Sequence, residues 1–333
     1  MLDVGLKLAS GKPNYLMLKM SDKLWDDPRC ITVPCRHCIG CRLEYSRQWA
    51  NRMMLELGYH DSAYFVTLTY DDYHVPISYY ADPETGEAFP SLTLRKRDLQ
   101  LFFKRLRFTF GGDKIRYYAC GEYGTDTLRP HYHAIIFGLH LDDLVLYKQS
   151  KDGYNYYNSA KLQRCWSERP SVTGLIGNKL DAPYLPIGYV VVGQVTWDTC
   201  AYTARYVAKK LMGADAQWYP DHGMELPFTV CSRKPGIGRQ YYDDHEEDIY
   251  RYDKISISTS TGGRSFRPPS YFDTLYSIEH PVEIERIKTI RRNMADSQMQ
   301  LKLRRTNMSY LEYLEIEERA HVERAKRLIR SDI

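Results

Sequence analysis

The sequence contains no apolar run of about 18 residues, the length that a membrane-spanning helix requires. Its opening stretch, MLDVGLKLAS, lacks the apolar core of a secretory signal. No segment matches the glycine-rich phosphate loop of ATPases, so ATP hydrolysis is not expected. Four of the eight cysteines lie within residues 30–41, which is typical of metal ligation in a reducing compartment and argues against a disulfide scaffold. We therefore expect a soluble, cytoplasmic protein with no membrane partner.

Phenylalanine is scarce beside tyrosine, with 10 residues against 29 in a chain of 333. Tyrosine suits a protein that stacks on bases while its hydroxyl stays hydrated, but this background also weakens any argument from one tyrosine alone. The net charge of +4 is small, yet residues 94–108 are strongly basic and residues 243–248 are acidic. Clustered arginine and lysine beside aromatic residues favour a polyanion partner, and the alternative is a solvated helix face.

The sequence pattern changes twice along the chain, which is long enough for one large or two modest domains. Residues 1–58 hold the cysteine cluster followed by an amphipathic helix. Residues 59–240 alternate between strand and helix patterns. Residues 241–333 are mostly helical in pattern, and after Pro281 neither glycine nor proline occurs, which predicts one or two long helices. We take these three ranges as the expected domains.

The middle region predicts an antiparallel sheet with helices packed on it. Side chains alternate in AYFVTLTY (63–70), as in a strand with one buried face. A basic amphipathic helix follows, with an apolar stripe formed by Leu99, Phe102, Phe103 and Leu106. Further elements are expected in the order of a strand at 114–124, a strand at 129–139, a Tyr- and Gly-rich insertion at about 147–187, a strand at 188–195 and a helix at 197–212. This order is typical of an α+β fold.

The stretch PHYHAIIF predicts a metal-binding pair. On a strand, His131 and His133 point to one face while Tyr132 points to the other, so the two imidazoles can share a divalent metal. Glu122 ends the preceding strand, about where an antiparallel neighbour would face the histidines, and Asp126 in the turn is the competing third ligand. Two histidines and one carboxylate leave positions open for a phosphate oxygen and water, as a catalytic Mg²⁺ or Mn²⁺ needs.

The stretch AYTARYVAKK places Tyr202 and Tyr206 on one face of a helix, with Lys209 one turn further. A tyrosine that attacks a phosphodiester forms a phosphotyrosine, which conserves the energy of the broken bond. A cation on the phosphate and Lys209 would supply electrostatic stabilisation, while Lys210 points elsewhere, toward backbone phosphate. The alternative is that both tyrosines are half-buried packing residues.

The cysteine cluster has the spacing C-x4-C-x2-C-x2-C, formed by Cys30, Cys35, Cys38 and Cys41. The three closely spaced thiols can hold Zn²⁺, with Cys30 or His37 as the fourth ligand. The same spacing also occurs in half of a ferredoxin-type iron–sulfur site, and zinc is preferred because no electron-transfer role is evident. We expect a structural knuckle.

Two basic loops contain glycine, RKPGIGR (233–239) and TGGRSFR (261–267). Backbone amides beside arginines can grip phosphates, so Arg233, Lys234 and Arg239 are candidate DNA contacts. The alternative is a plain turn with solvated charges.

Several motifs occur together in an order that resembles a known family. RPHYHAIIF followed by YTARYVAK resembles the HUH endonucleases, in particular the two-tyrosine initiators of rolling-circle phages. VPCRHCIGCRLEYSRQWANR, FVTLTY, CGEYG, SRKPGIGRQYY and STGGRSFRPP extend the resemblance to the replication initiators of microviruses in the gokushovirus branch. The resemblance covers about residues 30–273. One departure is Tyr132, which stands where the family name expects a plain hydrophobe.

The resemblance implies an HUH nuclease fold, with a central antiparallel sheet flanked by helices, an N-terminal Cys-rich metal knuckle and a C-terminal helical tail. Such an initiator nicks the viral strand at the origin of the double-stranded replicative form. One tyrosine holds the 5′-phosphate and the released 3′-OH primes the host polymerase. The second tyrosine later cleaves the regenerated origin, and the freed 3′-OH closes a single-stranded circle.

The resemblance also implies roles for individual residues and partners. The residues that match the family's metal ligands, paired nucleophiles and lysine are, in that order, Glu122, His131 and His133; Tyr202 and Tyr206; and Lys209. The implied cofactor is Mg²⁺ or Mn²⁺. The implied partners are phage origin DNA, in double- and single-stranded form, and a host helicase and DNA polymerase in the bacterial cytoplasm.

Three alternatives stay open at this point. A zinc-bearing single-stranded DNA-binding protein would need no tyrosine chemistry. A metallohydrolase using the histidine pair would activate water and form no covalent intermediate. A related HUH transposase usually carries one tyrosine, so two tyrosines at helical spacing favour replication.

Overall fold

The structure of the protein is a computed structural model, which describes residues 2–7, 13–16, 34–36, 38–150, 153–168, 184–209, 216–259 and 262–327. Three residues of the predicted sites, Cys30, His37 and Lys210, lie outside the described residues. Tyr206 and Lys209 belong to a described helix, but their side chains lie outside the description.

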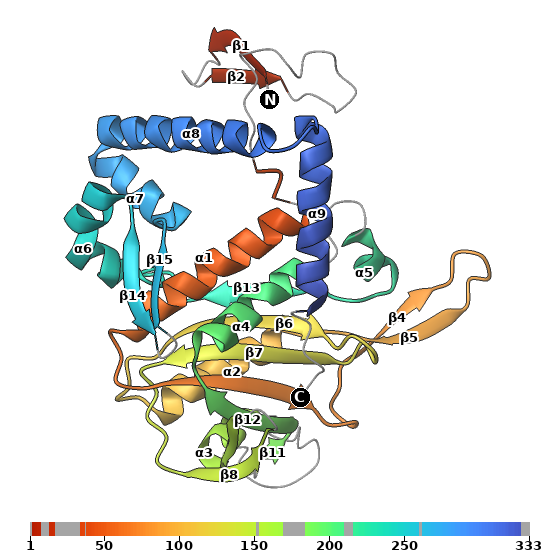
Figure 1. The fold of residues 1–333 in the computed structure, drawn as a ribbon. Helices are drawn as coiled ribbons and strands as arrows, with labels where there is room; N and C mark the ends of the chain where they lie inside the picture. The colour runs from red at the N-terminus through yellow and green to blue at the C-terminus, as the bar shows by residue number, and fades with distance from the viewer. Residues whose placement is uncertain are drawn as a thin grey trace, which may run out of the picture.

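The centre of the fold is an antiparallel sheet of seven strands in the order β13-β6-β7-β3-β12-β9-β8 (Figure 1). Its strands are β3 (Ala63–Tyr70), β6 (Arg116–Tyr123), β7 (Pro130–Phe137), β8 (Leu144–Gln149), β9 (Asn155–Ser159), β12 (Gly188–Gln194) and β13 (Phe228–Cys231). Hydrogen-bonded neighbours run antiparallel throughout. The predicted antiparallel sheet is confirmed, and the predicted strands at 63–70, 114–124, 129–139 and 188–195 all lie in it.

Helices cover both faces of this sheet, as the α+β prediction required. Helices α2 (Lys96–Thr109) and α3 (Ala160–Cys165) pack on the face that carries Leu68 and Tyr132. Helices α1 (Ile39–Leu57) and α4 (Trp197–Lys209) pack on the opposite face, against Phe65 and Ile135. Because side chains alternate along each strand, the two faces hold different residues of the same strands.

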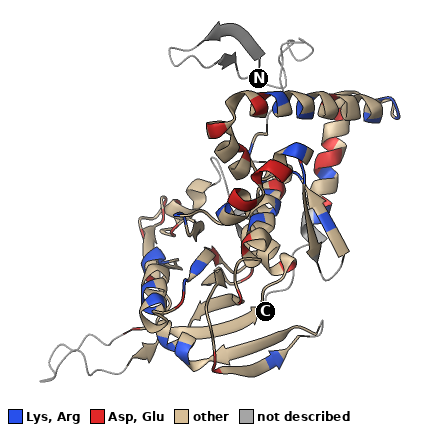
Figure 2. Ribbon diagram, turned by 90° about the vertical axis from the view of Figure 1, so that its left-hand side faces the viewer, with Lys and Arg blue, Asp and Glu red and all other residues tan. Residues whose placement is uncertain are grey.

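Helix α2 has the amphipathic pattern that the sequence indicates. Its predicted apolar stripe is buried throughout and consists of Leu99, Phe102, Phe103 and Leu106. Its basic residues lie on the outer side, and Figure 2 shows Lys and Arg gathered on this helix, whereas Asp and Glu gather on α6 (Arg239–Tyr252). The basic run is therefore a helix face on the outside of the sheet.

The Tyr- and Gly-rich insertion contributes strands that the sequence pattern does not predict. It contains part of β8, all of β9, α3 and the short pair β10 (Ser167–Glu168) and β11 (Leu185–Pro186). Nearly every residue of β8 is exposed, because it forms the outer edge of the sheet. An edge strand without a buried face lacks the apolar alternation by which a strand is recognised.

Smaller elements surround the sheet. The hairpin of β4 (Ile77–Ala81) and β5 (Ala88–Leu92) projects from one end of the molecule in Figure 1, where a loop or hairpin is expected from ADPETGEAFP. The remaining short elements are β1 (Leu2–Lys7), β2 (Pro13–Leu16) and α5 (Trp218–Asp221).

The C-terminal region is mostly helical, as predicted. After α6 come the hairpin of β14 (Ile255–Thr259) and β15 (Gly262–Phe266), then α7 (Ser270–Glu279), α8 (Pro281–Leu303) and α9 (Tyr310–Arg327). Two long helices therefore follow the start at Pro281. Leu55 of α1 joins the apolar core of this region, so α1 packs on both the sheet and the C-terminal helices. Within the described ranges, no helix is long and apolar enough to cross a membrane.

A buried carboxylate ties α1 to the sheet and to the loop at 233–239. Glu56 is only 4% exposed and accepts hydrogen bonds from Arg116, from His60 Nε2 at 3.0 Å and from the Gly238 amide at 2.6 Å. Arg116 also donates to the carbonyl of Gly236 at 2.9 Å. Burial alone would raise the pKa of Glu56, but these hydrogen bonds outweigh it and the pKa lies below its ordinary value of 4.5.

We predict that Glu56→Gln lowers the free energy of unfolding by about 3 kcal/mol at pH 7, because it leaves the Arg116 cation buried without its counter-charge. The folded-state pKa is depressed, so the carboxylate contribution is present above pH 4.5 and is lost as the pH falls through the folded-state value. The gap between the two proteins should therefore narrow in urea denaturation below pH 4.5. Glu44→Gln on the same helix is the control, and a change under about 0.5 kcal/mol is expected there. Equal stability of wild type and Glu56→Gln at pH 7 would contradict the assignment.

Candidate metal centre

The pairing of β6 with β7 brings three potential metal ligands together. Glu122 lies directly opposite His131, and Cys120 lies opposite His133. His131 and His133 are two residues apart on β7, so both point to the face covered by α1 and α4. One ligand atom from each of Glu122, His131 and His133 falls within 4.8 Å of the others. The three side chains that the sequence predicts as metal ligands therefore meet.

The cluster is buried and tightly connected. Glu122 Oε1 lies 2.7 Å from His131 Nε2 and 3.2 Å from His133 Nε2. Glu122 is 5% exposed and His133 is 3% exposed. Burial pushes the pKa of Glu122 upward, but the hydrogen bonds and charges of the two histidines outweigh this and hold the pKa below its ordinary value. The carboxyl group is thus kept ionised.

The outer nitrogen of each imidazole is held by a second group. His131 Nδ1 lies 3.1 Å from the carbonyl oxygen of Arg129, and a carbonyl oxygen only accepts, so this nitrogen carries the proton. His133 Nδ1 lies 3.0 Å from Thr67 Oγ1, on the neighbouring strand β3. Such partners orient histidine ligands and fix their tautomer. Thr67 is a positioning residue that sequence reasoning missed.

The donor set fits a divalent cation. With its proton on Nδ1, a neutral His131 ring directs the Nε2 lone pair at a carboxylate oxygen 2.7 Å away. Two lone pairs at this distance repel unless a second proton or a cation lies between them. Two imidazole nitrogens and a carboxylate suit Mn²⁺, and a carboxylate with open positions suits Mg²⁺.

Helix α4 places a tyrosine directly over the cluster (Figure 1). The Tyr202 ring stands edge-on to the His133 ring with centroids 5.4 Å apart, and it is 6.2 Å from the Phe65 ring. The side chain is partly exposed. Tyr206 and Lys209 lie on the same helix, with Tyr206 one turn beyond Tyr202. Tyr202 is thus near the cluster, as predicted.

Contacts with α1 and the start of the helix determine where α4 lies. Thr196 and Thr199 exchange hydrogen bonds between side chain and backbone at 2.8 and 3.1 Å, a reciprocal cap that begins the helix. Ser46 Oγ donates to the carbonyl of Ala201 at 3.1 Å. Trp197 Nε1 donates to Asn51 Oδ1 at 3.1 Å. These bonds hold Tyr202 in place above the sheet.

The residues next to the cluster have other positions. Asp126, the competing ligand, is exposed in the turn, and it is not part of the three-residue cluster. Tyr132 is fully buried on the opposite face, where its hydroxyl bonds to Tyr70 Oη at 2.9 Å and to the amide of Arg95 at 2.9 Å. The departure from a plain hydrophobe is thus accommodated by polar partners away from the cluster.

The loop at 233–239 lies at the far end of β6 from the cluster. Its position is held by Arg52 and Arg116, which donate to the carbonyls of Ile237 and Gly236. Arg233 and Lys234 are exposed, whereas Arg239 bonds to Asp243 at 2.6 Å. Six residues of extended strand separate Arg116 from Glu122, about 20 Å. This loop therefore lies outside the cluster itself.

In the second basic loop, Arg264 is stacked on Trp197, with its guanidinium carbon 3.8 Å from the ring centroid. Its charge therefore packs against the first residue of α4.

The predicted cysteine site is also brought together. The Sγ atoms of Cys35, Cys38 and Cys41 lie within 4.8 Å of one another, at the start of α1. The Cys38 amide donates to Cys35 Sγ at 3.2 Å. Burial, followed by hydrogen bonds with the neighbouring thiols, raises the pKa of Cys38 to about 11. The three groups need a bound cation to ionise together near neutral pH. Cys30, the predicted fourth cysteine, lies outside the described residues.

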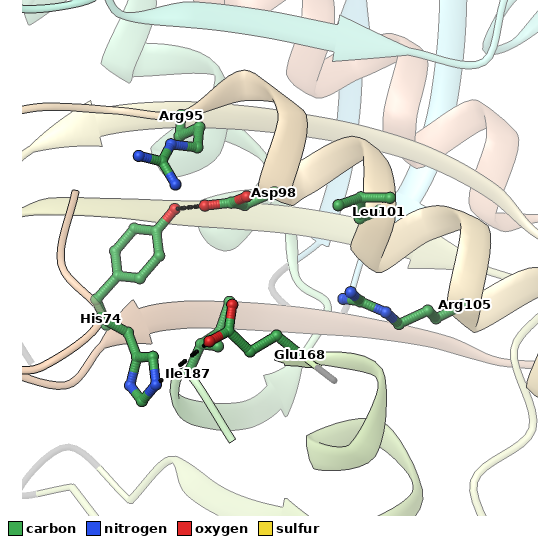
Figure 3. Close-up of a pocket in the computed structure, with 8 residues that line it drawn as sticks. His74, Arg95, Asp98, Leu101, Arg105, Glu168 and Ile187 are labelled. Carbon is green, nitrogen blue, oxygen red and sulfur yellow. Dashed lines mark hydrogen bonds and ion pairs between the residues drawn. The ribbon is translucent and has the colours of Figure 1, made fainter. Parts of the chain in front are cut away.

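A cavity of about 100 Å³ lies on the other face of the sheet, at α2 (Figure 3). Figure 3 shows Arg95, Asp98 and Arg105 from the helix facing His74 and Glu168. Tyr70 donates to Asp98 at 2.8 Å across this cavity. The sheet separates the cavity from the metal cluster, so the cavity is not part of that site.

The fold and the cluster define an α+β protein with a candidate metal centre between its sheet and a tyrosine-bearing helix. A family model for replication-associated proteins of the ORF2 type matches residues 63–211, which run from β3 to just past α4. The chain belongs to this family of phage replication-associated proteins.

Three relatives support the membership. "Replication-associated protein ORF2" of Spiroplasma virus 4 is 32% identical over 302 residues, which cover 90% of this chain and 85% of the relative. "Replication-associated protein VP4" of Bdellovibrio phage phiMH2K is 29% identical over 280 residues, covering 82% and 75%. "Replication-associated protein ORF4" of Chlamydia phage 1 is 29% identical over 251 residues, covering 73% and 53%. No solved structure matches the chain significantly.

We predict that Thr67→Val weakens binding of Mn²⁺ about 10-fold, because the His133 ring loses the hydrogen bond that orients it. Isothermal titration with MnCl₂ measures the affinity. Thr69→Val is the matched control, since Thr69 lies on the same strand and face but makes only a 3.5 Å contact with the carbonyl of Tyr189. Equal affinities of wild type and Thr67→Val would show that the hydrogen bond does not position a ligand.

Proposed function

We propose that the protein is a rolling-circle replication initiator of the HUH type, which nicks and rejoins the viral strand at the phage origin. The observation that carries the proposal is the buried cluster of Glu122, His131 and His133 beneath Tyr202, in a chain of the replication-associated family. The names of the relatives state an association with replication. The cluster and the tyrosine supply a chemical reason for it.

Glu122, His131 and His133 would hold Mg²⁺ or Mn²⁺, which when bound draws charge from the scissile phosphate. The protein contributes a carboxylate kept ionised by its two neighbours and imidazoles whose outer nitrogens are held by Thr67 and the Arg129 carbonyl. A substrate phosphate would enter from the partly exposed side of Tyr202. Burial of Glu122 and His133 keeps water away from the rest of the cluster.

The reaction follows from the nucleophile on α4. The phenolic oxygen of Tyr202 or Tyr206 attacks phosphorus, so a Tyr O–P bond forms and the P–O3′ bond breaks. The phenolic proton ends on the leaving 3′ oxygen, the 5′-phosphate stays on tyrosine, and the 3′-OH is free to prime synthesis. Lys209 would stabilise charge on the phosphate. The second tyrosine then cleaves the regenerated origin, and the freed 3′-OH attacks the first phosphotyrosine to close the circle.

DNA contacts outside the cluster complete the proposal. Lys210, Arg233, Lys234 and Arg239 would contact backbone phosphates of double- and single-stranded origin DNA, with Arg239 exchanging its bond to Asp243 for phosphate. Host helicase and DNA polymerase would act on the nicked strand. Residues 59–240 would form the endonuclease domain, between an N-terminal region 1–58 and a C-terminal region 241–333. Cys35, Cys38 and Cys41 would hold a structural Zn²⁺, which the sequence also assigns to Cys30.

We predict that the purified protein with Mn²⁺ forms a covalent adduct with single-stranded DNA from the genome that encodes it. The 3′ fragment carries the linked phosphate, so 3′-labelled DNA should migrate with the protein on a denaturing gel. DNA labelled at its 5′ end should instead give a free fragment that a polymerase can extend. The double variant Tyr202→Phe/Tyr206→Phe should lose adduct by roughly 10³-fold or more. EDTA should abolish the adduct, and added Mn²⁺ or Mg²⁺ should restore it.

Tyr252→Phe, which removes a hydroxyl from an exposed tyrosine of α6, should leave the adduct unchanged. Cleavage without an adduct would indicate a metallohydrolase instead. DNA binding without cleavage, unaffected by the double variant, would indicate a binding protein without tyrosine chemistry.

A further inference from the structure

The cysteine cluster at the start of α1 supplies three ligands of one kind in one place. Cys35 Sγ and Cys41 Sγ are 3.8 Å apart, and the Cys38 amide donates to Cys35 Sγ, a hydrogen bond common in zinc knuckles. Arg36, between the first two cysteines, has a positive φ of 64° and turns the chain back toward the cluster. Structural zinc sites are almost always four-coordinate, so a fourth ligand is required.

A histidine from the far end of the chain lies beside this cluster. His321 belongs to α9, which contacts α1 near its start (Figure 1). The point where a β-carbon on Gly40 would lie is 3.8 Å from His321 Nε2 and 4.0 Å from Cys38 Sγ. The imidazole and the thiol therefore approach the same side of Gly40 from two helices. A rotation of the His321 side chain about its Cα–Cβ bond carries Nε2 toward the thiols.

Helix α9 has little else to hold it against α1. None of its side chains that the structure describes is buried, and its apolar residues Ile316 and Val322 are 44% and 37% exposed. The ion pair from Lys302 to Glu317 joins α9 to α8 and not to α1. Apolar packing of this extent contributes little to the free energy of docking. A helix in this position needs another attachment.

We propose that His321 is the fourth ligand of a structural Zn²⁺ bound by Cys35, Cys38 and Cys41, and that this metal fastens α9 to the start of α1. The inference rests on the structural zinc of the proposed function and is independent of the nicking chemistry. The metal joins residues from the two ends of the described chain, so it closes most of the molecule into one loop. Zinc binding energy thereby becomes docking energy for α9.

The test is a titration of the full-length protein with Co²⁺, which replaces zinc and reports its ligands through ligand-field absorption. Wild type should give the intense bands of a tetrahedral site with three sulfurs and one nitrogen. His321→Ala should weaken Zn²⁺ competition for that site at least 10–100-fold, the range seen even for outer partners of a metal. His321→Cys should keep the metal, with stronger sulfur-to-cobalt charge transfer. Circular dichroism checks that each variant is folded.

His140→Ala, in an exposed loop bond to Asp113, is the control and should leave the cobalt spectrum unchanged. Hydrogen exchange gives a second readout, because zinc removal should speed amide exchange across α9 in wild type and have no further effect in His321→Ala. An unchanged spectrum and affinity in His321→Ala would overturn the proposal. So would loss of the fourth ligand on Cys30→Ser or His37→Ala instead. A missing DNA adduct would leave these metal measurements unaffected, so failure of nicking and failure of this site are distinguishable.

Discussion

The antiparallel register of β6, β7 and β3 determines which side chains meet at the centre of the molecule. It places Glu122 opposite His131 and Thr67 opposite His133, so a carboxylate, two imidazoles and a hydroxyl share one face. A slip by one residue would turn both histidines into the apolar core under α2. The buried polar hydroxyl of Tyr132 on the opposite face, with its partners on Tyr70 and Arg95, opposes such a slip.

Helix α1 connects this centre to the rest of the chain. Its buried face packs on the sheet beside α4, its residue Leu55 packs on the C-terminal helices, and its Glu56 holds the loop before α6. Its first turn carries the cysteine cluster. The position of α4, and with it Tyr202, therefore depends on a helix that is itself attached at both ends.

Local patterns predicted the elements of the site, whereas long-range contacts required the structure. The alternation of AYFVTLTY and the stripe of α2 came from burial on one face, so periodicity sufficed. Sequence spacing placed His131 and His133 on one face and favoured Glu122 as their partner. Spacing carried no information on register across strands, so Thr67 was missed. His321 lies far from the cysteines in sequence, and β8 is an exposed edge strand, so neither left a local signal.

The central claim is that a tyrosine of α4 becomes linked to DNA, and mass spectrometry of the adduct tests it most directly. Trypsin cuts after Arg205, so Tyr202 and Tyr206 fall on separate peptides and can be told apart. After nuclease digestion, the account predicts a nucleotide attached through phosphate to the peptide that ends at Arg205 or to the one that begins at Tyr206. A nucleotide on any other residue would contradict the account, as would cleaved DNA with both peptides unmodified.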